Sequence, residues 1–103
     1  MKYGVIRTDT ADALIRGIIL YVAENFGNSM ALENLDELEE AILSLGNNPY
    51  IGTTPKYNVL KRQGYMVLIL EKNLVFYKIK EKIVTVYAVL GQIQNYLDII
   101  RGL

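Results

Sequence analysis

Apolar residues recur at three- and four-residue steps over two long stretches in the first half of the chain, and this spacing predicts two amphipathic helices. The first is predicted over residues 11–26, after the polar run Thr8-Asp9-Thr10, which contains good helix caps. The second is predicted over residues 29–45, with Ser29 as its cap. Because the turn between them is very short, we expect an antiparallel helix hairpin. Gly17 inside the first helix costs about 1 kcal/mol relative to alanine, which indicates close packing there.

The second half of the chain changes to β-branched and aromatic residues, in short runs separated by polar turns. Runs at residues 65–70, 74–79 and 83–90 predict three antiparallel strands. A shorter run at residues 3–7 predicts a first strand, which must pair with the late strands because alone it has no partner. Helical spacing returns after Gly91, in a short closing helix that carries Ile93, Tyr96, Leu97, Ile99 and Ile100.

The order strand, helix, helix, three strands, helix predicts one α+β domain over residues 1–103. Its sheet has four mostly antiparallel strands, and the helix hairpin covers one face. If the apolar strand residues mostly face the helices, charged and aromatic groups remain for the open face or its rim. These groups are Lys61, Arg62, Lys78 and Tyr77 or Tyr87.

Composition limits the possible chemistry. The chain has no cysteine and no histidine, so it can form no disulfide, thiolate metal site or histidine general base. We therefore expect no metal and no cofactor, and any catalysis must use lysine, arginine, tyrosine or carboxylate groups. The apolar part of the first residues is too short for a secretory signal, and no run reaches the roughly eighteen apolar residues of a spanning helix. A cytoplasmic protein without membrane association is expected.

Charge divides the chain into two halves although the net charge is zero. Residues 1–50 carry three cations against eight anions, and residues 51–103 carry eight cations against three anions. This split suggests one acidic and one basic surface, and the basic one can meet nucleic acid or an acidic partner. A solvated, lysine-rich rim of the sheet explains the same pattern equally well.

Three segments resemble the RelE/ParE superfamily of toxins in order and spacing. They are Leu45-Gly-Asn-Asn-Pro-Tyr-Ile-Gly52 at the end of the helix hairpin, Asn73-Leu-Val-Phe-Tyr-Lys78 in a strand, and the closing Val89-Leu-Gly-Gln-Ile-Gln-Asn-Tyr96. Each motif alone is weak. Three in the right order, with the expected elements, are fairly specific, and the resemblance covers nearly the whole chain.

The resemblance implies the toxin of a bacterial type II toxin–antitoxin system, of the kind that serves plasmid stabilisation or stress responses. Such a toxin stops growth unless its cognate antitoxin binds it in a hetero-oligomer. One branch of the superfamily cleaves messenger RNA in the ribosomal A site, and the other poisons DNA gyrase. Cleavage without a metal needs cations at the phosphates and groups that assist attack by the 2′-hydroxyl, whereas poisoning needs only a binding surface.

Five residues are candidates for the site. Lys61 and Arg62 form the densest basic pair and would contact phosphate or the antitoxin, or else lie in a solubilising loop. Tyr77 matches the tyrosine of the Val-Phe-Tyr motif, and we expect a packing role, with a functional hydroxyl as the alternative. Tyr96 matches an aromatic position of the family, but its helical spacing favours the core. Gln94 matches a position that is often Arg or Gln and offers hydrogen bonds without charge.

Several departures from the family pattern bear on the target. Leu74 stands where the nuclease branch usually has an arginine, Met66 where related sequences often have one, and Ile93 in place of the first arginine of the closing motif, while Asn95 replaces a frequent aspartate. An arginine at the developing phosphorane is worth several kcal/mol, so these departures argue against efficient RNA cleavage. Gyrase is therefore the favoured target. The alternatives are a ribosome-dependent endoribonuclease that uses Lys61, Arg62 and a tyrosine, a degenerate domain that only binds antitoxin, and an unrelated α+β domain.

Overall fold

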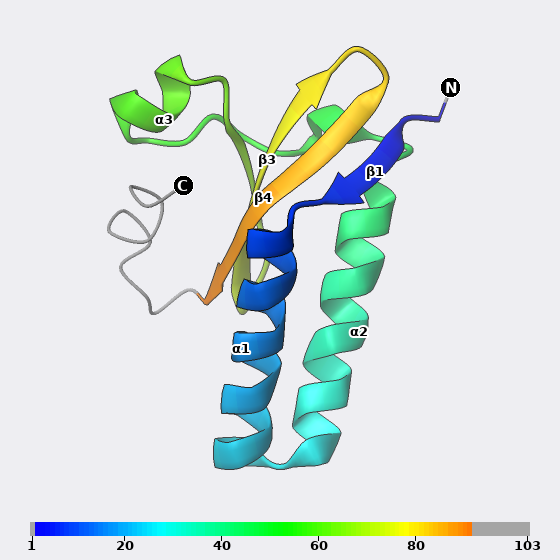
Figure 1. Cartoon of the computed structure of the whole chain (residues 1–103), viewed down its shortest axis with the longest axis vertical. Helices are drawn as coiled ribbons and strands as arrows, with labels where there is room; N and C mark the ends of the chain where they lie inside the picture. Colours follow the sequence, from blue (N-terminus) through cyan, green and yellow to red (C-terminus); the bar gives the residue numbers. More distant parts are fainter. Residues whose placement is uncertain (1, 92–103) are drawn as a thin grey trace.

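The computed structural model of the chain describes residues 2–91 (Figure 1). In chain order the elements are β1 (Gly4–Arg7), α1 (Asp9–Phe26), α2 (Asn28–Ser44), the 3-10 turn η1 (Pro49–Ile51), α3 (Asn58–Arg62), β2 (Met66–Ile69), β3 (Asn73–Lys80) and β4 (Ile83–Gly91). The α+β class, the helix hairpin and the four strands are confirmed. The closing helix predicted after Gly91 lies outside the described residues.

The two long helices have different N-caps. At α1 the side chain of Thr8 accepts a hydrogen bond from the Ala11 N–H at 3.0 Å, which confirms a cap in the polar run. The prediction that Ser29 caps α2 is wrong, because α2 begins at Asn28 with Gly27 as its N-cap. Gly27 has a φ of 94°, a backbone conformation that glycine adopts without strain. The chain reverses direction at Gly27, so α2 already begins at Asn28, before the expected cap Ser29.

The sheet has the strand order β1-β4-β3-β2. The first strand pairs with the last, as expected, and runs parallel to it from Gly4 opposite Ile83 to Arg7 opposite Val86. The other two pairings are antiparallel. The register between β3 and β4 shifts between Phe76 and Tyr77, and this bulge leaves Tyr87 without a partner across the strand pair.

The helix hairpin packs on one face of the sheet and builds the first core. Its buried members from the helices include Ala11, Ile15, Leu38, Ile42 and Leu45, and those from the strands include Val75, Tyr77, Val84, Val86 and Val89. In Figure 1, α1 and α2 lie side by side and continue past the lower end of the sheet. Near that end the side chains of Leu20, Tyr21, Phe26 and Leu32 are exposed.

The opposite face of the sheet is also apolar, and this corrects the expectation of an open, polar face. A second core contains Leu60 of α3 and Tyr65, together with Val67, Leu74, Phe76, Ala88 and Leu90 of the strands. The sequence had predicted no element between the hairpin and the first late strand. The short helix α3 forms there because Leu60, which is 1% exposed, packs onto the strands. Within residues 2–91 no helix is long and apolar enough to cross a membrane.

Candidate functional site

Lys78 of β3 lies against two tyrosine rings on the second face of the sheet. Its Nζ is 4.5 Å from the centre of the Tyr65 ring and 5.2 Å from that of Tyr87. The two rings meet edge to face, with centres 5.6 Å apart. An ammonium group over aromatic rings and an edge-to-face ring pair are both favourable arrangements. The bulge in β4 contributes to this cluster, since Tyr87 and Ala88 both pack with the second core.

The phenol of Tyr65 is largely withdrawn from water. Its side chain is buried, and this burial, with a smaller contribution from the neighbouring Tyr87, raises the pKa of Tyr65 above its ordinary value. The Tyr65 hydroxyl therefore stays protonated at neutral pH and can donate a hydrogen bond. Beside it, Lys78 supplies a positive charge. A cation next to a phenol donor is suited to holding an anionic group.

Lys61 and Arg62 are exposed at the end of α3, on the same side of the sheet as this cluster. The helix α3 contacts this cluster directly, because the Tyr65 N–H donates to the Leu60 carbonyl at 3.2 Å and both residues belong to the second core. The Arg62 Nε donates a long hydrogen bond to the Asn58 carbonyl, at 3.5 Å. We call Lys61, Arg62, Tyr65, Lys78 and Tyr87 the basic tyrosine face.

Tyr77 lies in the first core, on the other face of the sheet. The expectation that it lines the open face or its rim is wrong. The strand alternation turns its ring toward the helices, where it is fully buried in the first core. The hydroxyl donates to the Pro49 carbonyl at 2.7 Å and accepts from the Gly52 N–H at 3.1 Å. Burial raises the pKa of Tyr77, and the bond from Gly52 opposes this only in part. The hydroxyl is thus committed to the backbone of the segment after α2.

Gly52 explains why this contact needs a glycine. A Cβ atom there would overlap the Tyr77 hydroxyl and would lie 2.8 Å from the Val67 carbonyl oxygen. The segment Leu45 to Gly52 and the Val-Phe-Tyr segment of β3, which carry two of the three resemblances, are therefore parts of one hydrogen-bonded unit. Packing accounts for a glycine at position 52 and a tyrosine at position 77.

The positions where related sequences often carry arginine are packed here. Leu74 is 7% exposed and belongs to the second core, and Met66 packs against the first core. The candidates Gln94 and Tyr96, and the departure at Ile93, lie outside the described residues.

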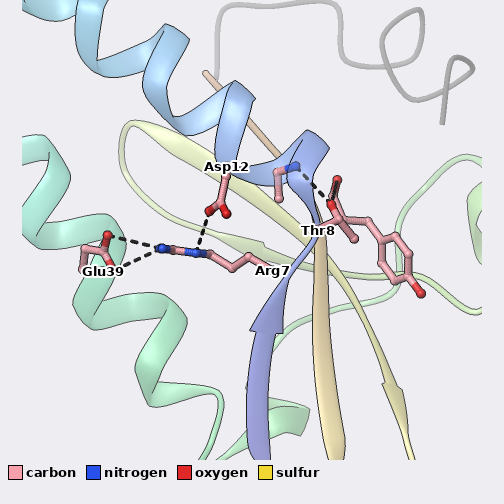
Figure 2. Close-up of polar contacts among 6 residues, drawn as sticks. Arg7, Thr8, Asp12 and Glu39 are labelled. Atoms are coloured by element: carbon pink, nitrogen blue, oxygen red, sulfur yellow. Dashed lines mark hydrogen bonds and ion pairs between the residues drawn. The ribbon is translucent and has the colours of Figure 1, made fainter.

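Arg7 was not singled out from the sequence, yet it joins three elements (Figure 2). Its Nε lies 2.9 Å from a carboxylate oxygen of Asp12, and its Nη1 lies 3.1 and 3.2 Å from the two carboxylate oxygens of Glu39. The ion pairs tie the end of β1 to the first turn of α1 and to α2. Next to it, Thr8 Oγ1 also reaches the Tyr87 carbonyl at 3.4 Å, at the bulge.

A second unexpected contact is the buried pair Asn34 and Asn73. The Asn73 side chain donates from Nδ2 to Asn34 Oδ1 at 2.8 Å, and both residues are buried. Asn73 opens the strand motif Asn-Leu-Val-Phe-Tyr, so the pair connects the start of β3 to α2. A buried amide needs such a partner, because leaving it unpaired is costly.

Comparison with models of protein families identifies the family of this chain. The family model described as ParE toxin of type II toxin-antitoxin system, parDE, matches residues 5–96. The chain belongs to the ParE toxin family. The match takes in the helix hairpin and, except for Gly4 at the start of β1, all four strands of this ParE-family toxin. A comparison with curated protein sequences finds no match.

Solved structures support the fold of the ParE-family chain. The chromosomal ParDE toxin–antitoxin system from P. aeruginosa aligns with a TM-score of 0.74 at 18% identity, covering 87% of this chain and 96% of the other. The RelBE2 toxin–antitoxin complex from Mycobacterium tuberculosis aligns with a TM-score of 0.63 at 15% identity, covering 91% and 95%. The solution structure of a conserved hypothetical protein from Helicobacter pylori aligns with a TM-score of 0.54 at 14% identity, covering 87% and 94%. At these identities the similarity shows a shared fold, as the RelE/ParE resemblance had implied.

Proposed function

We propose that this ParE-family toxin inhibits growth by binding DNA gyrase, and that a cognate antitoxin relieves the inhibition by binding the toxin. The observation that carries the choice of target is the packing of Leu74 and Met66. Metal-free RNA cleavage needs cations that face the reacting phosphate, and at these two positions the chain has apolar side chains packed against its cores. The chain also lacks histidine, the most frequent general base.

The basic tyrosine face is the surface we assign to partner binding. Lys61 and Arg62 are exposed there, and Tyr65 and Lys78 place a phenol and an ammonium group on the same side of the sheet. An acidic protein segment or a phosphate backbone is complementary to this charge. One similar structure is described as a toxin–antitoxin complex and another as a ParDE toxin–antitoxin system, which supports an antitoxin as one of the partners.

Two assays on the purified protein test the target. In the first, gyrase supercoils relaxed plasmid in the presence of the toxin, and in the second, programmed ribosomes carry a messenger RNA whose cleavage is followed. We expect lost supercoiling and intact RNA. Cleaved RNA with normal supercoiling would reject the gyrase proposal.

Charge reversal tests the surface. The double variant Lys61→Glu and Arg62→Glu is expected to weaken antitoxin and gyrase binding and to flatten their salt dependence, because it reverses two positive charges on this face. Both side chains are exposed, so we expect the fold to survive the change. The matched control is Lys2→Glu with Lys80→Glu, which changes the net charge equally at exposed positions outside the basic tyrosine face. Equal losses in both double variants would show that net charge, and not this surface, controls binding.

The alternative that a specific observation favours is RNA cleavage on the ribosome. Lys61, Arg62 and Lys78 gather cations near the protonated Tyr65 phenol, and such a set can bind a phosphate and donate a proton. Loss of the RNA-cleaving activity in the charge-reversal variant would support it. A protein that binds antitoxin and is inactive in both assays would instead be a degenerate antitoxin-binding domain.

A further inference from the structure

The edge strand β2 has an open backbone position at Ile69. The strand pairs with β3 on one side, and on its outer side Val67 exchanges two backbone hydrogen bonds with Thr53, at 2.8 and 2.9 Å. Backbone groups along a strand point to alternate sides, so the N–H and C=O of Ile69 point to the same outer side as those of Val67. Within residues 2–91 no backbone group bonds to them. One more strand residue can therefore pair with Ile69.

The chain itself turns away before it reaches this position. Thr53 lies opposite Val67 in an antiparallel bridge, so Ile51 would lie opposite Ile69 if the bridge continued. Ile51 instead ends the turn η1. A separate segment that pairs with Ile69 in the same antiparallel direction would run toward Thr53, which already occupies the next position. Such a segment must turn or end there.

A small pocket lies beside Ile69 on the second face of the sheet. Apolar strand residues and polar loop residues line it, among them Ile69, Leu74, Phe76, Thr53, Thr54 and Lys56. Residues that lie opposite each other in a sheet turn their side chains to the same face, so a residue paired with Ile69 would point its side chain into this pocket. The volume of about 260 Å³ lies below the range of roughly 300–1,000 Å³ typical of small-molecule sites, which suits a single apolar side chain.

Lys56 gives this end of the edge its charge. The side chain is exposed, and no carboxylate within residues 2–91 pairs with it. Residues 53–70 contain the cations Lys56, Lys61 and Arg62 and no aspartate or glutamate. A negative group at the end of an added segment is complementary to this charge. A chain that ends at Thr53 needs no turn, and its terminal carboxylate is such a group.

We propose that β2 binds the free C-terminal end of another protein. The last residue of that protein lies opposite Ile69, its apolar side chain enters the pocket, and its carboxylate faces Lys56. The carboxylate also accepts a hydrogen bond from the Ile69 N–H, and hydrogen bonds to a charged acceptor are stronger than those to a neutral one. Backbone pairing then supplies affinity and the pocket selects the side chain. The site shares no residue with the basic tyrosine face, so the inference does not rest on the target proposed above.

Titration of the unaltered toxin with the peptide acetyl-Thr-Ser-Thr-Thr-Leu tests the site, because the only charge of this peptide is its terminal carboxylate. We expect a Kd below about 1 mM. The same peptide as its C-terminal amide, and the same peptide ending in alanine, should each bind on the order of tenfold more weakly, since they lack the charge or the apolar side chain. No binding of the free acid at about 1 mM, or equal affinities of acid and amide, would overturn the proposal.

Methylation of the peptide nitrogens separates strand pairing from charge attraction. A methyl group on the nitrogen of the last residue removes the N–H that donates to the Ile69 carbonyl, and we expect binding to weaken on the order of tenfold. The control carries the methyl group on the preceding residue, whose N–H points away from β2. That peptide should bind nearly as well as the parent. Equal losses with both methylated peptides would contradict the pairing with Ile69.

Two protein variants test the charge. Lys56→Gln should lower the affinity for the free acid to that for the amide, whereas the control Lys80→Gln, at an exposed position outside the pocket, should not change it. Both side chains are exposed, so we expect both variants to fold. Equal effects of the two variants would mean that net charge, and not Lys56, attracts the peptide.

Hydrogen exchange at the Ile69 amide, followed by NMR, is the direct structural measurement. We expect fast exchange in the free toxin and exchange slowed on the order of tenfold by saturating peptide, because the amide is open to water until the peptide pairs with it. An Ile69 amide already protected without peptide would show that the edge is closed and would overturn the proposal. A toxin that inhibits gyrase and does not bind the peptide would refute this site and leave the proposed function intact.

Discussion

Replacing Tyr77 with phenylalanine removes one oxygen atom from the first core and leaves the ring in place. That oxygen joins β3 to the segment after α2, since it donates to the Pro49 carbonyl at 2.7 Å and accepts from the Gly52 N–H at 3.1 Å. Both Tyr77 and Pro49 are buried. The freed carbonyl therefore has no water to replace the lost hydroxyl.

The expected loss follows from the two groups left behind. An unsatisfied buried carbonyl costs about 1–3 kcal/mol, and the half-buried Gly52 N–H adds less because it regains some contact with water. We expect the free energy of unfolding to fall by about 2 kcal/mol. In a domain of this size, that corresponds to a decrease in Tm of roughly 8–16 °C.

Urea unfolding followed by circular dichroism measures this loss. The control is Tyr50→Phe, which removes the same atom from a side chain that is 66% exposed and should change stability by less than about 0.5 kcal/mol. Equal midpoints for the Tyr77→Phe variant and the unaltered protein would refute the structural role. If that variant is as stable as the parent but no longer inhibits growth, its hydroxyl acts in the function instead.

Three further predictions concern the cores. Leu38→Ala and Ile42→Ala, at side chains 0% and 2% exposed, should each lower the free energy of unfolding in urea by about 2–5 kcal/mol. The control Leu43→Ala, at a side chain 66% exposed, should lower it far less. Equal small losses at all three positions would mean that the buried face of α2 is misplaced. Leu74→Arg should destabilise by about 3–5 kcal/mol, because it puts an unpaired charge into the second core, while Leu74→Met should be tolerated. Unchanged stability of the Leu74→Arg protein would refute the burial of this side chain in the second core. Burial raises the pKa of Tyr65 and Tyr77 in the folded state, so their contribution to stability is complete below about pH 10, where unfolded tyrosine ionises, and is lost as the pH rises through the folded pKa values. Tyr77→Phe should therefore make the alkaline decline in the free energy of unfolding shallower. An unchanged slope would contradict this role of Tyr77.

The periodicity of the chain was sufficient for the hairpin and the strands, but not for α3. That helix has five residues and one buried side chain, Leu60, so it carries no repeating apolar pattern. It forms where tertiary packing supplies the stabilisation that local preference lacks. One sequence signal of the second core was present. The run Leu74-Val-Phe-Tyr77 does not alternate, and such a run is typical of a strand that is buried on both faces.

The polar contacts were less accessible from sequence because their partners lie far apart in the chain. Arg7 and Glu39 are separated by 32 residues, and Asn34 and Asn73 by 39. Local spacing contains no information on such pairs. Tyr77 was expected to pack, and it does, but its two backbone partners depend on the path of the chain around Gly52. Likewise, the cluster around Lys78 depends on a bulge, which brings Tyr87 to that face.

The parallel pairing of β1 with β4 also governs when the toxin can fold during its synthesis. The first strand finds its partner only in residues 83–86, so the sheet cannot close before most of the chain has left the ribosome. Pairings between such distant segments are slow to form, because a long loop must be closed first. The helix hairpin, by contrast, is made of local contacts and can form early. We expect a nascent chain that ends before residue 83 to contain the hairpin without a closed sheet, which force measurements on stalled chains of increasing length can detect. The surface that the closed sheet carries would then form only after residues 83–86 have been synthesised.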